Sequence, residues 1–178
     1  CEMTVKEART IAEQYHRKPN PSDEDFFIFT EAMDFLIKEQ NNPRDMMHLG
    51  GVYYERREFD LALKYYEMAS EVVVKPADGI YNYEKGLAIL KLNPKADVTA
   101  MYKDIVTVGE ASLTTYVQRF WESFDRGPYE QDINAAAYYM QGVGYMAQGN
   151  KEKADEMFKK ALVERNDHLW ANYYLGNL

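Results

Sequence analysis

AAAYYMQGVGYMAQGNKEKADEMFKKALVERNDH, residues 135–168, contains two helical patterns separated by one turn. Small and aromatic residues recur in each half at steps of three and four: Tyr138, Gly142 and Tyr145, then Ala154, Phe158 and Ala161. Residues at these steps lie on one face of a helix. The pair Gly149-Asn150 between the halves stops the first helix. The stretch predicts a helix hairpin in which small residues let the helices approach closely and aromatic rings fill the space between them.

This spacing resembles the tetratricopeptide repeat, a helix hairpin of about 34 residues with the pattern W-x2-L-G-x2-Y, then A-x3-F, A and P. Five residues match the pattern: Gly142, Tyr145, Ala154, Phe158 and Ala161. Tyr138 stands at the Trp position, Gln141 at the Leu position, and Asn166 replaces the closing Pro. The resemblance implies an all-α fold of antiparallel helix hairpins stacked in a right-handed solenoid, with residues 1–178 as a single domain.

Two further segments fit the same frame. Residues 43–76 match it, with Met46 in place of the Trp and Tyr66 in place of the Phe. The matching residues are Leu49, Gly50, Tyr53, Ala62 and Ala69. Residues 79–112 are a divergent copy, in which the pattern positions are held by Gly86, Ile89, Val98, Tyr102 and Ile105. Asn93-Pro94 predicts the turn of this copy, with Pro94 at the first position of the next helix.

The N-terminal residues 3–40 are expected to form a degenerate helix pair. Val5, Ala8, Ile11, Ala12 and Tyr15 predict a helix over residues 4–16. Ser22 then has the character of an N-cap, and the second helix continues to about Gln40. This helix is apolar nearly all round at its start, which predicts packing on two sides: Phe26, Phe27, Ile28 and Phe29.

Residues 113–126 are an extra helical segment that fits no repeat. One separate extra helix would reverse the direction of the next hairpin. Two alternatives follow: one long helix over 96–125 that is bent near Gly109, or two helices with a sharp turn at Gly109. After the repeat at 135–168, residues 169–178 begin a partial repeat or capping helix. Its aromatic and leucine side chains are expected to pack partly on the preceding hairpin and partly to form a contact surface.

Composition excludes several classes of function. The chain has 178 residues and a net charge of −8, which argues against binding to nucleic-acid phosphates. No apolar run reaches the roughly 20 residues that a membrane-spanning helix needs. The single cysteine is Cys1, which fits a lipidated bacterial lipoprotein in the periplasm or outer membrane; the alternative is an arbitrary boundary and a cytoplasmic protein. A membrane association is expected only through such a lipid.

No catalytic or metal-binding pattern is present in the sequence. The three histidines, His16, His48 and His168, are far apart in sequence and have no partner at metal-ligand spacing. Gly142-Val143-Gly144 lies inside a helical pattern and lacks the Lys-Ser/Thr of a phosphate loop. We expect no enzyme activity and no cofactor.

The resemblance implies that the first helices of successive repeats line a concave groove. The groove positions that it predicts are Met47, Tyr54, Tyr83, Leu87, Tyr139, Val143, Met146, Trp170 and Tyr173. Family members that clamp an acidic peptide tail use Lys and Asn at positions held here by apolar, aromatic and glycine residues, so such a clamp is not expected. The alternative for each groove residue is burial by the N-terminal helix pair or by residues 113–125.

The sequence is consistent with two different functions. The first is a non-enzymatic scaffold that binds a protein or peptide segment along the aromatic groove, with self-association through the C-terminal helix as a further contact. The second is a cell-surface or periplasmic lipoprotein that recognises a glycan by stacking sugar rings on Trp121 and Trp170.

Overall fold

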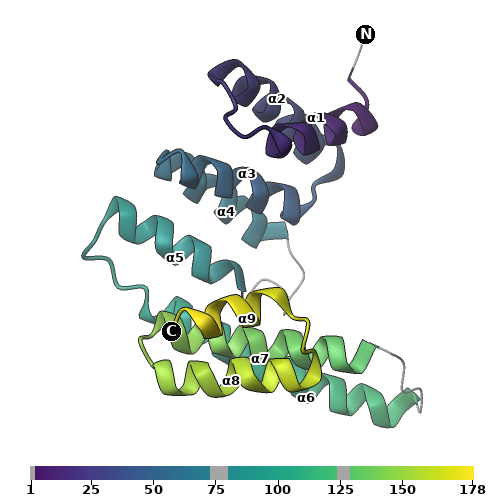
Figure 1. Cartoon of the computed structure of the whole chain (residues 1–178), viewed down its shortest axis with the longest axis vertical. Coiled ribbons are helices and arrows are strands. Elements are labelled where there is room, and N and C mark those ends of the chain that lie inside the picture. The colour runs from purple at the N-terminus through teal and green to yellow at the C-terminus, as the bar shows by residue number, and fades with distance from the viewer. Residues whose placement is uncertain (1–2, 73–79, 124–128) are drawn as a thin grey trace. The chain divides into compact units, whose positions relative to one another are not determined.

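The structure is a computed structural model that describes residues 3–72, 80–123 and 129–178, without the side chains of 114–123 and 129–131. The elements within these ranges are all helices (Figure 1): α1 (Val5–Arg17), α2 (Asp23–Gln40), α3 (Pro43–Glu55), α4 (Phe59–Val72), α5 (Tyr81–Leu92), α6 (Thr99–Ser123), α7 (Tyr129–Ala147), α8 (Lys151–Glu164) and α9 (Leu169–Gly176). Contacts divide the chain into two compact units, residues 1–73 and residues 74–178. Cys1 lies outside the described residues.

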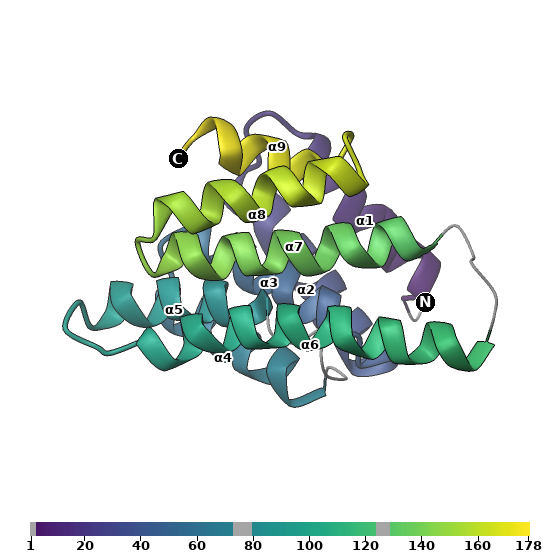
Figure 2. The same cartoon turned by 90° about the horizontal axis from the view of Figure 1, so that it is seen from below.

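Each unit is built from helix hairpins. In the first unit, α1 packs on α2 and α3 packs on α4. In the second unit, α5 packs on α6, α7 packs on both α6 and α8, and α9 packs on α8. Figure 2 shows α6, α7 and α8 side by side in this unit. The predicted all-α fold of antiparallel hairpins is therefore confirmed.

Local sequence signals set the helix ends where they were predicted. Thr4 caps α1 in a capping box with Glu7, and Ser22 caps α2 in a second capping box with Asp25. Asn41 ends α2 in the left-handed conformation, with φ 47°, and Asn42 caps α3. Short polar side chains fit these positions because they satisfy backbone groups that a helix leaves unpaired.

Three hairpins share one contact between a glycine and an aromatic ring. The pairs have the same offset in sequence, from 50 to 66, from 86 to 102 and from 142 to 158: Gly50 with Tyr66, Gly86 with Tyr102, and Gly142 with Phe158. A Cβ atom on Gly142 would lie 2.5 Å from Cε1 of Phe158, and the other two glycines are as tightly covered. Ala154 and Ala161 are fully buried in the same hairpin. The prediction that Gly142 serves close helix packing is confirmed, and the divergent copy keeps the same contact.

Residues 99–123 form one continuous helix, as the first of the two alternatives predicted, and not two helices with a sharp turn at Gly109; the bend near Gly109 stays a prediction. The first half of this helix lies on α7 through two further glycines that the repeat pattern does not contain. A Cβ on Gly109 would lie 2.9 Å from the carbonyl oxygen of Ala137, and one on Gly144 would lie 2.6 Å from Cγ2 of Val106. The backbones of α6 and α7 therefore approach closely at two points.

The prediction that Pro94 begins the next helix is wrong, because α6 starts at Thr99. Asn93 instead closes a turn: its side-chain oxygen accepts from the Lys95 amide at 3.1 Å and its carbonyl accepts from the Ala96 amide at 3.0 Å. The Asp97 carboxylate then accepts from the Thr99 amide at 2.9 Å. The cap that Asp97 provides therefore decides where the helix begins, although proline is also favoured at the first position of a helix.

Helix α2 packs on two neighbours, α1 and α3, as expected, but not all of the apolar residues at its start are covered. Phe29 is fully buried, but Phe27 is 60 % exposed and Ile28 is 41 % exposed. The buried face continues one and two turns later at Ala32, Met33 and Leu36. A helix turns 100° per residue, so α1 and α3 cover the Phe29 side and leave the adjoining side open.

One cluster of buried residues in the second unit is formed by Val98, Tyr102 and Ile105. Another lies where α7, α8 and α9 meet. Its buried residues are Val143, Ala154, Phe158, Ala161 and Ala171, and the half-buried rings of Tyr83, Tyr139 and Tyr174 pack against them. Among the described residues, no helix is long and apolar enough to cross a membrane.

Candidate functional site

The predicted groove residues fall into both units. Met47 and Tyr54 lie half-buried on α3 of the first unit. The second unit holds the remainder, on α5, α7 and α9: Tyr83, Leu87, Tyr139, Val143, Met146, Trp170 and Tyr173. The structure brings together the aromatic members of this second group.

Val143 is not available to a partner in this structure. Its side chain is fully buried in the core of the second unit, together with Phe158 of α8 and Ala171 of α9. Met146, one turn further along α7, packs half-buried against the same core. Val143 therefore supports the surface from beneath.

Aromatic residues gather around this core, and we call the set the tyrosine face. Its members are Tyr83, Tyr139, His168, Trp170, Tyr173 and Tyr174. The ring centroid of Tyr139 lies 4.9 Å from that of His168 and 6.3 Å from that of Tyr174. Trp170 and Tyr173 continue the patch outward, with ring centroids 6.2 Å and 5.3 Å from Tyr174.

The position of α9 is fixed at both its start and its buried side. The imidazole Nδ1 of His168 accepts from the Ala171 amide at 3.2 Å and so caps the helix. Ala171 itself is fully buried against the core. The opposite side of α9 leaves Trp170 54 % exposed and Tyr173 55 % exposed. Large rings held this far in water on a fixed helix are typical of a contact surface.

A carboxylate adjoins the tyrosine face. Glu84 follows Tyr83 on α5 and is half-buried, and this burial raises the pKa of its carboxyl group. The phenol of Tyr139 has a raised pKa because of burial first, and then because Tyr174 and Glu84 lie nearby. The pKa of Tyr174 is raised by burial and by the same Glu84 charge. Glu84 therefore lies within electrostatic reach of the rings of α7 and α9.

The first unit contains two polar contacts that the sequence did not indicate. Arg9 of α1 donates to the buried Asp45 of α3 at 2.5 and 2.7 Å, and to Gln40 at the end of α2 at 2.5 Å. His16 and His48 stack with centroids 4.5 Å apart and their Nε2 atoms 2.5 Å apart. No sequence spacing pointed to either pair, because each joins two different hairpins.

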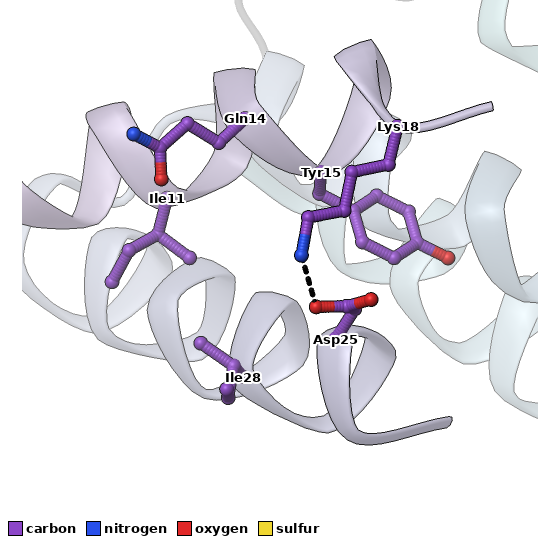
Figure 3. Close-up of a pocket in the computed structure, with 6 residues that line it drawn as sticks. All are labelled: Ile11, Gln14, Tyr15, Lys18, Asp25 and Ile28. Atoms are coloured by element: carbon purple, nitrogen blue, oxygen red, sulfur yellow. Dashed lines mark hydrogen bonds and ion pairs between the residues drawn. The ribbon is translucent and has the colours of Figure 1, made fainter. Parts of the chain in front are cut away.

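Two cavities can be described by the residues that line them. One of about 150 Å³ lies between α1 and α2 and is crossed by the ion pair of Lys18 and Asp25 (Figure 3). Lys18 and the cap residue Ser22 hold the pKa of Asp25 at about 2. A second cavity, of about 350 Å³, lies at the turn before α6 and includes Asp97 and Gln148. Across the described ranges, no three His, Cys, Asp or Glu side chains are grouped to hold a metal ion.

Comparisons with known proteins find structural likeness only. No family model matches the chain, and no curated protein matches it. A solved structure of MamA from Desulfovibrio magneticus RS-1, residues 41 to the end, is similar with 21% identity and a TM-score of 0.45. The MamA RS-1 ArsTM double mutant is similar with 20% identity and a TM-score of 0.46. In each case the alignment covers 97% of this chain and 82% of the MamA chain.

The side chain of Trp121, the second ring suggested for glycan stacking, lies outside the described residues.

Proposed function

We propose that this chain is a non-enzymatic, tetratricopeptide-like module that binds a segment of another protein on the tyrosine face. The observation that carries the proposal is the exposure of Trp170 and Tyr173 on a helix whose other side is locked into the core. Trp and Tyr dominate the binding energy of many protein interfaces, because a large rigid ring buries much area at little entropic cost.

The repeat assignment within this proposal is supported by geometry. The glycine–aromatic contact recurs in three hairpins at one sequence offset, and the small residues of the pattern are buried beside it. Within the second unit, Leu87 and Met146 are half-buried and belong to the proposed partner surface; Met47 and Tyr54 are proposed as partner contacts of the first unit by itself.

Selection from a randomised peptide library tests the proposal. The full chain, immobilised, is expected to enrich peptides whose affinity falls at least about tenfold in a Trp170→Ala, Tyr173→Ala double variant. Both side chains are more than half exposed, so their removal should leave the fold intact. Val163→Ala is the matched control, because Val163 is 86 % exposed on α8 and makes no part of the tyrosine face.

Two results would contradict the proposal. One is that no peptide is enriched over the input library. The other is that the enriched peptides bind the double variant and the Val163→Ala control with the same affinity. Sedimentation of the chain alone tests self-association. If the chain forms a concentration-dependent dimer and the Trp170→Ala, Tyr173→Ala variant does not, the face binds a second copy of this chain.

A further inference from the structure

We infer that His16 of α1 and His48 of α3 form a binding site for a divalent transition metal ion that favours imidazole ligands, such as Zn²⁺ or Cu²⁺. The two Nε2 atoms are the protein ligands, and water completes the coordination shell. The site lies within the first unit and does not rest on the proposed function. A bound ion joins the hairpin of α1 and α2 to the hairpin of α3 and α4.

The two imidazole rings direct the same nitrogen atom toward one point. The Nε2 of His16 lies 2.5 Å from the Nε2 of His48, and the ring centroids are 4.5 Å apart. Zinc binds an imidazole nitrogen at about 2.0–2.1 Å, so tetrahedral coordination by both rings places their Nε2 atoms about 3.3 Å apart. The two nitrogens need to separate by only about 0.8 Å for this. Because both side chains are exposed, small changes in their χ angles can supply that movement.

The pair can present both Nε2 lone pairs to a metal ion at neutral pH. Two imidazoles this close do not both hold a charge: desolvation lowers the pKa of His48, and the charge of His16 lowers it further. Without a metal, the short contact requires one ring to donate its Nε2 proton to the Nε2 of the other. When a metal ion binds, that ring carries its proton on Nδ1 instead, and both Nε2 atoms become ligands.

Aromatic packing holds the two histidines in place. The buried ring of Phe29 on α2 meets both of them edge to face, with centroids 5.5 Å from His16 and 5.7 Å from His48. Tyr15 stacks on Phe29 at 4.3 Å and lies edge-on to His16 at 5.4 Å. Three helices therefore position the pair before any ion arrives, so binding needs to order little further structure.

The number of protein ligands sets the kind of ion and a moderate affinity. Asp45 lies three residues before His48 on α3, but its carboxylate already accepts from Arg9 at 2.5 and 2.7 Å. Over the ranges that the structure describes, no third His, Cys, Asp or Glu completes the group. Two imidazoles and water suit an ion such as Zn²⁺ or Cu²⁺, whereas Mg²⁺ and Ca²⁺ require oxygen ligands.

Titration of the full chain with Zn²⁺ tests the site, in a Cys1→Ser background that removes the one thiol. Isothermal titration calorimetry is expected to show one Zn²⁺ ion bound per chain, and Mg²⁺ should give no binding. The affinity for Zn²⁺ should fall at least about tenfold in His16→Gln and in His48→Gln, because each variant removes one of two ligands. His168→Asn is the matched control, since it removes the third imidazole of the chain and keeps a side chain that can cap α9.

Nitrogen NMR of the histidine rings adds a readout that a change in stability alone would not move. Zn²⁺ should shift the Nε2 signals of both His16 and His48 and leave that of His168 unchanged. It should also raise the melting temperature of the parent chain and of His168→Asn, but not that of the two glutamine variants. Zn²⁺ binding that is equally tight in His16→Gln, a shift of only one of the two Nε2 signals, or no saturable binding to the parent chain would each overturn the inference.

Discussion

Gly142 shows at the scale of one residue why the hairpins close. The ring of Phe158 occupies the space that any larger side chain would need, with its Cε1 atom 2.5 Å from where a Cβ would lie. We expect Gly142→Ala to destabilise the chain by about 1–2 kcal/mol, because overpacking outweighs the helix propensity gained. Urea unfolding followed by circular dichroism measures the change. Gly176→Ala is the control, since a Cβ there meets nothing within 4 Å and should be neutral.

Gln141 offers a prediction of the opposite sign. It holds a position that the repeat pattern gives to leucine, it is only 5 % exposed, and its Nε2 is the buried side-chain atom without a hydrogen-bond partner in the described chain. Gln141→Leu should therefore stabilise the fold by about 1–3 kcal/mol, the usual cost of an unsatisfied buried donor. Gln148→Leu should give no gain, because the Nε2 of Gln148 donates to the Gly144 carbonyl at 2.9 Å. A loss of stability in Gln141→Leu would show that the amide is satisfied in solution.

Among the helices of the first unit, Arg9 of α1 connects α2 and α3 through hydrogen bonds to Gln40 and Asp45. Removing it leaves the Asp45 carboxylate buried without its two donors. Arg9→Ala is expected to cost about 1–3 kcal/mol, below the range for a fully buried pair because the guanidinium is partly exposed. Arg17→Ala on the same helix is the control, since its contact to Glu13 is exposed and 3.9 Å long. Equal melting temperatures for the two variants would contradict a role for the Arg9 contacts in holding α1.

The histidine pair between α1 and α3 predicts a dependence on pH. Burial lowers the pKa of His48 below its ordinary 6.5, and the charge of His16 lowers it further. The unfolded chain therefore binds a proton at His48 more readily than the folded chain does. The contribution of His48 to the free energy of unfolding is fully present above about pH 6.5, and it is lost as the pH falls below that value. Proton NMR titration should place the His48 pKa below 6.5, and His16→Gln should raise it. An unchanged His48 pKa in that variant would contradict the coupling.

The elements themselves were largely predictable, because the signals that define them are local. Ser22 and Asn42 cap helices from positions adjacent in sequence, and the step from Gly142 to Phe158 spans one hairpin. Predictions failed where a neighbouring element or a competing cap decided the outcome. Phe27 was expected to be buried because its neighbours in sequence are apolar, but its side chain is exposed. The helix that was expected to begin at Pro94 begins at Thr99 instead, where the Asp97 carboxylate accepts from the Thr99 amide.

The candidate site was predictable only in part for the same reason. Trp170 and Tyr173 are exposed because their helix presents one face to the core, which periodicity can indicate. The burial of Val143 depends on α8 and α9 closing over α7, and the reach of Glu84 to Tyr174 depends on helices separated by 90 residues, from 84 to 174. No local pattern encodes such distances.

At the scale of the whole molecule, the net charge of −8 should accelerate the approach of a basic partner. We expect the association rate of a selected basic peptide to fall about tenfold between low salt and 0.5 M salt, since ions screen long-range attraction. The dissociation rate should change much less, because it depends mainly on short-range contacts at the interface. Surface plasmon resonance separates the two rates, and an association rate insensitive to salt would contradict the role of net charge.

The pairing of each helix with its neighbour in sequence has a consequence for how the chain reaches its structure. Closing a hairpin such as α7–α8 requires only a short loop, so little entropy is lost before the first contacts form. Proteins of such low contact order collapse quickly, and arrays of this kind gain stability hairpin by hairpin. Pulled from its two ends, the chain should lengthen in several small steps, each the release of one hairpin.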